Sequence, residues 1–252
     1  MTPQRLVLPL LGAVTLALFV ASLLLGPAGA PAGRSLAALL TGDNPALALV
    51  MREIRLPRAL LGLGIGAALG LAGAALQGYL RNPLAEPGLL GVSAAAALGA
   101  VLAFYTGLAA LLPLALPLMA LGGAFAATLL VVGLAGVAGG ALTLILAGVA
   151  VSSLAGALTS LVLNLSPNPF AASEIMFWLL GSLADRSWMH VALAGPFILA
   201  GMGLLLLLAR DLEALTLGED AARSLGIPLG RTRALALGGT AGRLAGRPGP
   251  LE

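Results

Sequence analysis

Apolar residues run along this chain in long stretches that charged residues rarely interrupt, and this pattern predicts membrane-spanning helices. Between Glu86 and Glu174 there are 87 residues without a single Asp, Glu, Lys, Arg or His. As one helix, that stretch would be about four times as long as the ~30 Å hydrocarbon core of a bilayer is thick. The chain must therefore fold back on itself and cross the membrane about three times within this stretch.

Breaks rich in glycine and proline divide the apolar stretches into separate helices, and within the uncharged run they fall at 105–113 and 136–140. The predicted spans are 6–25, 59–79, 89–104, 111–134, 142–165 and 191–209. The fold class is therefore all-α, a polytopic transmembrane helical bundle with six full spans. The first span imitates a cleaved signal, but its 20 apolar positions exceed the usual ~7–15, which favours a retained helix.

Composition supports this assignment and excludes several classes of protein. Hydrophobic residues make up 60% of the chain and charged residues 9%, with a mean hydropathy of +1.06. Soluble domains carry about 25% charged residues, so this chain cannot cover a water-facing surface. Because it lacks cysteine, it has no disulfide framework and no thiolate metal site. Its net charge of +3 comes from a few scattered arginines, which do not predict nucleic-acid binding.

Small residues are expected to mediate the packing of the helices, because the chain has 35 glycines and only 4% aromatic residues. In the second span they recur at every fourth position, at Gly62, Gly66, Gly70, Ala74 and Gly78. Such a stripe permits close approach of a neighbouring helix. The same segment contains G-x-G-x-x-A, but no predicted strand precedes it, so packing is favoured over dinucleotide binding.

The residue types that catalysis or metal binding requires do not come together in the sequence. The one histidine, His190, lies beside Trp188 at the edge of the sixth span, where an interfacial side chain is the ordinary interpretation. A single histidine without cysteine or a carboxylate cluster argues against a metal site. An intramembrane enzyme would need a catalytic pair within the spans, and the sequence offers none. We therefore expect no catalytic residues, no metal and no cofactor.

Polar residues within the fifth span carry more information. Ser153, Gly156, Ser160 and Asn164 follow one another at steps of three, four and four, so they share one helical face. Such a face either forms hydrogen bonds with neighbouring helices or lines a translocation path, and the spacing fits both.

Three arginines, Arg52, Arg55 and Arg58, lie just before the second span. They are either interfacial anchors that reach lipid phosphates or a docking surface for an acidic partner, because guanidinium groups pair bidentately with carboxylates. Arginine counts on the two sides of the membrane are six and five, so the positive-inside rule does not fix the orientation.

Charge returns after Arg210, where four acidic residues and three arginines lie between positions 211 and 233. Residues 219–225 predict a short helix that ends at Gly226, with Pro228 beyond it. A helix this polar cannot lie in lipid. It is expected to be an exposed element available to a partner protein.

Five motifs, in this order, resemble the permease subunits of binding-protein-dependent ABC importers for ferric siderophores, haem and cobalamin, the FecCD type. They are R-L-P-R at 55–58, Q-G-Y-L-R-N-P-L-A-E-P-G-L-L-G-V at 77–92, L-I-L-A-G-V-A-V-S-S at 144–153, W-L-L-G-S-L at 178–183 and L-G-E-D-A-A-R-S-L-G at 217–226.

The resemblance implies a ten-helix permease in the bacterial cytoplasmic (inner) membrane that pairs with a second permease subunit. Two cytoplasmic ABC ATPases would lie below it, and a periplasmic or lipid-anchored substrate-binding protein above it. The implied mechanism is alternating access driven by the ATPases, so the permease itself would not be an enzyme. The N-terminus and the loop after Arg210 would face the cytoplasm.

The resemblance also assigns roles to individual residues. Arg55 and Arg58 would dock glutamates of the binding protein, and the segment 174–183 would be a short helix near the outer gate. The translocation path would be lined by Ser153, Ser160 and Asn164. The ATPase-coupling element would comprise Gly218, Glu219, Asp220, Ala222, Arg223 and Gly226.

The last part of the chain departs from the family pattern. We assign 1–237 to an incomplete permease transmembrane domain and 238–252 to an aberrant, Arg- and Gly-rich tail without an apolar span. The family pattern would continue there with a seventh span and three more helices, and a frameshift or a truncated reading frame would produce such a tail. The alternative to a permease is therefore a non-functional or scaffold membrane fragment of one.

Overall fold

The computed structural model describes residues 4–26, 30–112, 114–136, 140–166, 173, 175–176, 179–184, 186–215, 217–227, 232 and 236, and all regular structure in these ranges is helical. The predicted tail at 238–252 lies outside them. The chain forms two compact units, Met1–Gly64 with Leu183–Ala192, and Ile65–Ser182 with Leu193–Glu252. Each unit is described by itself.

The first unit begins with α1 (Gln4–Leu24), an apolar helix whose side chains are almost all exposed. It continues with α2 (Ala32–Leu40), α3 (Pro45–Leu49), the π-helical segment η1 (Val50–Arg55) and the beginning of α4 (Leu56–Leu80). The Asn44 side chain caps α3 by accepting from the Leu47 N–H at 3.1 Å. The sequence predicted no element between the first two spans, so α2, α3 and η1 are additions made by the structure.

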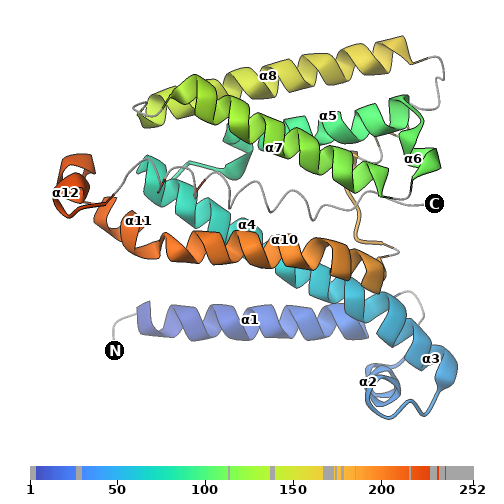
Figure 1. Ribbon diagram of the computed structural model, residues 1–252. Helices are drawn as coiled ribbons and strands as arrows, with labels where there is room; N and C mark the ends of the chain where they lie inside the picture. The colour runs from blue at the N-terminus through green and yellow to red at the C-terminus, as the bar shows by residue number, and fades with distance from the viewer. Residues whose placement is uncertain are drawn as a thin grey trace. The chain divides into compact units, whose positions relative to one another are not determined.

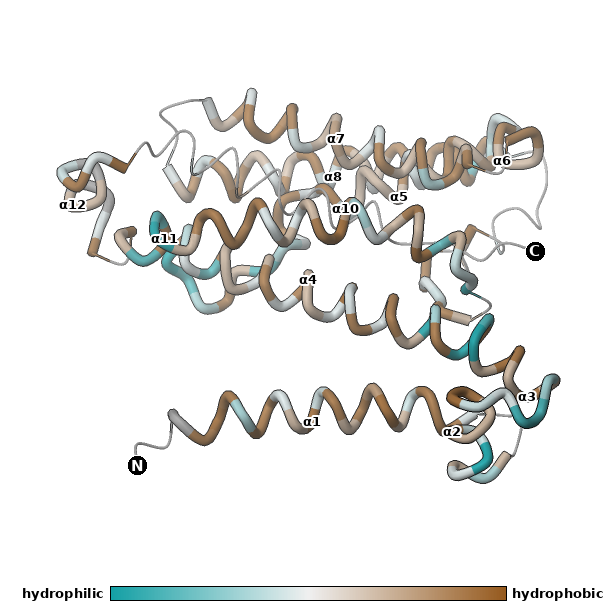
Figure 2. Tube along the Cα trace, turned by 60° about the horizontal axis from the view of Figure 1, so that its bottom comes forward, coloured by the Kyte–Doolittle hydropathy of each residue, from teal (hydrophilic) through white to brown (hydrophobic). Residues whose placement is uncertain are grey.

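The second unit contains the rest of α4, the 3-10 segment η2 (Pro87–Leu90) and three helices that pack on one another. These are α5 (Val92–Tyr105), α7 (Ala115–Ala135) and α8 (Ala141–Leu165), with the one-turn α6 (Leu108–Leu111) between α5 and α7 (Figure 1). The unit ends with most of α10 (Trp188–Leu207), α11 (Ala209–Leu215) and α12 (Glu219–Ser224). Figure 2 shows that hydrophobic residues prevail along the long helices.

Five of the six predicted spans are helices long and apolar enough to cross a membrane, and the chain is a multi-pass membrane protein. The exception is α5, which has 14 residues. It is shorter than predicted because residues 87–90 form η2, and Gly91, with a φ of 71°, turns the chain before Val92. The predicted breaks at 105–113 and 136–140 are confirmed, since α5 ends at Tyr105, α7 begins at Ala115 and ends at Ala135, and α8 begins at Ala141.

Glycines bring the backbones of α5, α7 and α8 into direct contact. A methyl group at Gly99 would overlap the carbonyl oxygen of Met119, and one at Gly123 would overlap that of Ala95. Gly148 on α8 has the same relation to the carbonyl oxygen of Leu89. Packing through small residues, as predicted, therefore builds this group of helices.

The predicted glycine stripe on α4 does not make the same kind of contact within the described chain. A methyl group at Gly66 or Gly70 would meet nothing within 4 Å, and Ala74 is exposed. At the end of the stripe, a methyl group at Gly78 would lie 3.7 Å from the Leu212 side chain. No helix of the described chain approaches the middle of the stripe, so the close approach that the stripe permits stays a prediction there.

Candidate functional site

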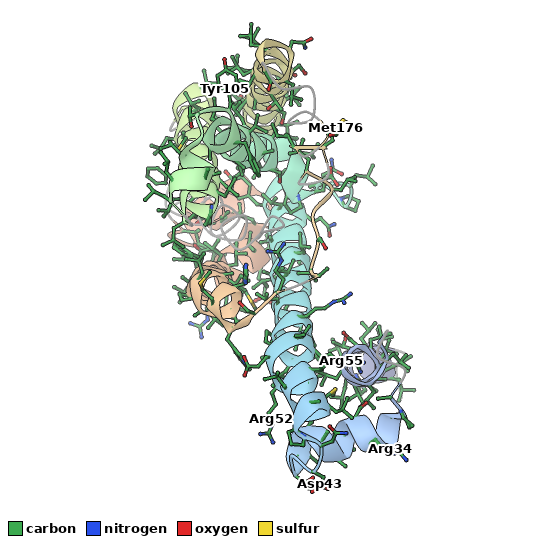
Figure 3. All side chains as sticks on the ribbon, turned by 90° about the vertical axis from the view of Figure 1, so that its right-hand side faces the viewer. Arg34, Asp43, Arg52, Arg55, Tyr105 and Met176 are labelled. Carbon is green, nitrogen blue, oxygen red and sulfur yellow. The ribbon has the colours of Figure 1, made fainter. Side chains whose placement is uncertain are left out.

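The predicted docking arginines lie at the junction between η1 and α4, in the first unit. Arg55, labelled in Figure 3, is 7% exposed, and its Nη1 donates to the carbonyl oxygens of Leu23 at 3.1 Å and Leu24 at 3.0 Å. These residues end α1, where carbonyl groups have no partner within the helix and the helix dipole favours a cation. Arg55 therefore caps α1. Gly26 makes room for it, since a methyl group there would lie 2.7 Å from Nη2 of Arg55.

Arg52 performs the same task for the neighbouring helix. Its Nε and Nη2 donate to the carbonyl oxygen of Leu39, at 3.1 and 2.8 Å, in the last turn of α2. The two arginines of η1 thus hold the C-terminal ends of two helices against one short segment.

The π-helical geometry and Pro57 together leave the Arg52 carbonyl oxygen without a donor in its own helix. The Leu56 N–H donates to the Met51 carbonyl oxygen instead, and Pro57 has no N–H. The indole Nε1 of Trp188 donates to this free carbonyl oxygen at 3.0 Å. The beginning of α10 is therefore tied to η1 within the first unit.

These contacts change the interpretation of the R-L-P-R motif. Of the two predicted docking residues, Arg58 is exposed and Arg55 is buried. The structure places the Arg55 guanidinium inside the unit, because it serves the carbonyl groups of α1, and so does not present it to a partner.

His190 lies at the beginning of α10, at the edge of the span as predicted, but its side chain is buried in a polar cluster, which its position beside Trp188 did not indicate. It is 8% exposed, and its Nε2 lies 3.2 Å from Nη1 of Arg186, which is 2% exposed. Its Nδ1 lies 3.2 Å from the backbone nitrogen and 3.0 Å from Oγ of Ser187. The backbone N–H of Ser187 donates to Nδ1 of His190, so this ring nitrogen is an acceptor.

Sequence reasoning missed this cluster because Arg186 lies in a loop, where an exposed arginine is the ordinary expectation. Histidine four residues after arginine at a helix start was the only available signal. No group of three potential metal ligands occurs among the residues that the structure describes.

The residues predicted to line a path share one face of α8, as their spacing required. Ser153, Ser160 and Asn164 are all exposed, and Nδ2 of Asn164 donates to the Ser160 carbonyl oxygen at 2.8 Å. A methyl group at Gly156, between them, would meet nothing within 4 Å. The buried face of α8 is formed by Leu144, Ala147, Gly148, Val151 and Ala155. The polar face of α8 is therefore uncovered within the described chain.

The predicted coupling element forms a short helix between two glycines with positive φ. Gly218 has a φ of 106° and Gly226 a φ of 80°, and α12 lies between them. The Ala222 N–H donates to the Gly218 carbonyl oxygen at 2.9 Å, and the Ala222 side chain is fully buried. The predicted helix and its glycine stop are confirmed. Glu219, Asp220 and Arg223 lie on α12, and their side chains are outside the described part of the structure.

Tertiary structure also brings two of the sequence motifs together. A methyl group at Gly91, in the motif at 77–92, would lie 2.8 Å from the Gly148 carbonyl oxygen and 3.1 Å from Oγ of Ser152, both in the motif at 144–153. Asn82, in the first of these motifs, closes its own turn by accepting from the Leu84 N–H at 2.9 Å. The motif at 178–183 lies partly outside the described residues.

Comparison with known proteins gives consistent matches along the chain. The model of the FecCD transport family matches residues 14–244. The uncharacterized ABC transporter permease protein YvrB of Bacillus subtilis is 41% identical over 202 residues, which cover 77% of this chain and 56% of YvrB. The cobalamin import system permease protein BtuC of Halobacterium salinarum is 39% identical, with 75% and 51% covered. The ferric enterobactin transport system permease protein FepD of Escherichia coli is 40% identical, with 86% and 65% covered.

A solved structure agrees with these matches. It is described as an inward-facing conformation of a metal-chelate type ABC transporter, and it superposes with a TM-score of 0.83 at 30% identity, covering 96% of this chain and 74% of that chain. The chain spans about half to two thirds of the length of the curated relatives named above.

Proposed function

Because the chain belongs to the FecCD transport family, we propose that it forms the membrane-spanning path of an ABC importer for iron–siderophore, haem or cobalamin. The observation that carries the proposal is the family match over residues 14–244, together with relatives named as permeases for cobalamin and ferric enterobactin. The exposed polar face of α8 supports it, because polar side chains in a span face either a partner helix or a water-filled cavity.

The proposed path runs along Ser153, Ser160 and Asn164. Their hydroxyl and amide groups offer hydrogen bonds to a passing polar chelate without a charge that would hold it. A second permease subunit, the same chain or a related one, would supply the opposite wall. Alternating access then requires that the path open to one side of the membrane at a time.

The partners follow from the same proposal. A cytoplasmic ABC ATPase would seat α12 and hydrolyse ATP, and a periplasmic or lipid-anchored binding protein would dock at the corner that exposes Arg58. A carboxylate on the binding protein would pair with that guanidinium group. Arg55 would support this corner from inside by holding α1 against η1. The membrane would be the bacterial inner membrane.

Transport by proteoliposomes tests the proposal. The full chain is reconstituted with an ABC ATPase and a substrate-binding protein of such an importer, and ATP-dependent uptake of radiolabelled ferric siderophore, haem and cobalamin is measured separately. We expect uptake of one of the three, and Ser160→Leu should reduce it at least tenfold because a bulky apolar side chain would narrow the path. Gly133→Leu is the matched control, since Gly133 is also exposed on a long apolar helix and has open space around it. A complex that assembles and hydrolyses ATP without taking up any of the three substrates would refute the proposal.

A further inference from the structure

The end of α4 lies beside α11 and the turn that leads into α12, all within the second unit (Figure 1). A methyl group at Gly78, in the last turn of α4, would lie 3.7 Å from the Leu212 side chain of α11. Three residues further on, Arg81 extends toward the turn, since a methyl group at Gly218 would lie 4.0 Å from its Nη1. Gly218 begins the predicted coupling element, and its carbonyl oxygen accepts from the Ala222 N–H at 2.9 Å.

Arg81 reaches this turn from a backbone conformation that arginine rarely adopts. Its φ is 50°, and among the described residues it is the one residue other than glycine with a positive φ. The conformation ends α4, because the Asn82 N–H donates to the Gln77 carbonyl oxygen at 3.1 Å. The Arg81 N–H donates to that of Gly78 at 3.4 Å. This pair of hydrogen bonds is a Schellman motif, whose left-handed position usually holds glycine and sometimes asparagine. Helix termination therefore does not explain an arginine at position 81.

From Arg81 the chain continues to α8 as a series of short turns. Backbone hydrogen bonds of 3.0 to 3.2 Å close three of them, at 82–85, 86–89 and 88–91. The side chains of Ala85 and Leu90 are buried. The loop 82–91 is therefore fixed by its own hydrogen bonds and by burial.

The far end of this loop is in backbone contact with α8, the helix that carries the proposed path. A methyl group at Gly148 would overlap the Leu89 carbonyl oxygen. One at Gly91 would lie 2.8 Å from the Gly148 carbonyl oxygen and 3.1 Å from Oγ of Ser152. Ser152 adjoins Ser153, the first residue of the proposed path. Because closely packed interiors transmit strain, a shift of the loop 82–91 must displace α8 or break this contact.

We propose that Arg81 is a positioning residue that joins the turn before α12 to the loop 82–91, so that a displacement of α12 is passed to α8. The inference rests on the proposed function, because the ATPase is what would displace α12. Coupling between distant sites is carried by packed and hydrogen-bonded segments, and each step here is a contact within one unit. The long arginine side chain spans the distance from the end of α4 to the turn, which glycine or asparagine could not do. An arginine that only anchored α4 at lipid headgroups would leave α12 independent of the loop.

Hydrogen–deuterium exchange of the full chain in nanodiscs tests the positioning step. Arg81→Gly removes the side chain and adopts the left-handed conformation at the end of α4 without strain. We expect the Ala222 amide, which donates to Gly218, to exchange at least fivefold faster in Arg81→Gly. Arg81→Lys keeps the charge and most of the reach, and its Ala222 amide should stay close to the wild-type rate. Arg34→Ala, which removes an exposed arginine from α2, is the matched control and should leave this amide unchanged.

The same measurement in complex with an ABC ATPase of such an importer tests the transmission step. Exchange is compared with and without a non-hydrolysable ATP analogue. In the wild-type protein, the analogue should change the exchange of the α12 amides and of the amides at 89 and 91 by at least threefold. In Arg81→Gly the change should be confined to α12, and the uptake of substrate per ATP hydrolysed should fall at least tenfold. Arg81→Lys should restore both.

Unchanged exchange of the Ala222 amide in Arg81→Gly would overturn the proposal. So would an effect of the analogue that still reaches positions 89 and 91 in that variant. Arg81→Asn, which also tolerates a positive φ, replaces Arg81→Gly if the glycine variant fails to fold. An analogue without effect on α12 in the wild-type complex would refute the ATPase contact and this proposal with it. Failure to take up any of the three substrates, with an intact response at 89 and 91, concerns the proposed function alone.

Discussion

Replacing Arg55 with alanine separates helix capping from docking at the corner of the first unit. The guanidinium group donates to two carbonyl oxygens at the end of α1. Leaving a buried acceptor unpaired costs ~1–3 kcal/mol, so two of them amount to roughly 2–6 kcal/mol. Removing Nη2, which is buried without a hydrogen-bond partner, returns about 1–3 kcal/mol. The packing of the end of α1 against η1 is therefore expected to lose about 1–3 kcal/mol of free energy in total.

Hydrogen–deuterium exchange in nanodiscs measures this loss where it arises. The amides in the last turn of α1 should exchange about 5- to 150-fold faster in Arg55→Ala, because local opening governs their exchange. In Arg55→Lys the exchange rate of these amides should lie between those of the wild-type protein and Arg55→Ala, since a single ammonium group cannot match the planar guanidinium group. Arg58→Ala is the control, and because Arg58 is exposed it should change the free energy by less than about 0.5 kcal/mol.

A measurement of how tightly the substrate-binding protein docks should rank the Arg55 and Arg58 variants in the opposite order. Arg58→Glu should weaken docking at least tenfold while leaving the exchange of α1 amides unchanged, because its effect is electrostatic and lies on the surface. Arg55→Ala with wild-type exchange and abolished docking would refute the capping argument, and would restore Arg55 as a group that contacts the partner.

Four further predictions follow from the packing and the coupling element. Gly123→Leu should prevent α5 and α7 from packing and abolish folded protein in size-exclusion chromatography, whereas Gly133→Leu should elute normally, because only the first side chain meets backbone. Trp188→Phe should lower the midpoint of thermal unfolding by removing one indole hydrogen bond, worth about 1 kcal/mol, and an unchanged midpoint would contradict that role. Gly226→Ala should destabilise α12 by about 1–2 kcal/mol, because its φ is 80°, and protease cleavage near residue 226 should become faster. Arg223→Glu should leave assembly intact but uncouple ATP hydrolysis from uptake, and normal coupling would count against α12 as the ATPase contact.

The sequence predicted the main helices well, because lipid leaves the chain few alternatives. Every backbone polar group within the bilayer must be paired inside the chain, so an uncharged run of 87 residues has to become helices. Glycine and proline then identify the breaks, and α7, α8 and α12 begin and end close to where the pattern indicated. Periodicity alone also placed Ser153, Ser160 and Asn164 on one face.

The structure decided what the arginines do. A sequence shows that Arg55 and Arg58 both precede a span, but burial depends on which helix ends lie nearby, and those ends are more than thirty positions away in the chain, at Leu23. His190 and Arg186 lie only four positions apart, and it is their burial, not their pairing, that the sequence did not indicate.

Identity and spacing of residues were thus sufficient for the class of protein, for its helices and for the motifs of its family. The contacts of its charged groups were set by the tertiary structure alone. The physical reason is the separation along the chain of the residues involved. The free energy of transferring apolar side chains into lipid is a sum over one local segment. The surroundings of a buried guanidinium group or an empty space depend on atoms that distant segments bring, or fail to bring, to the same place.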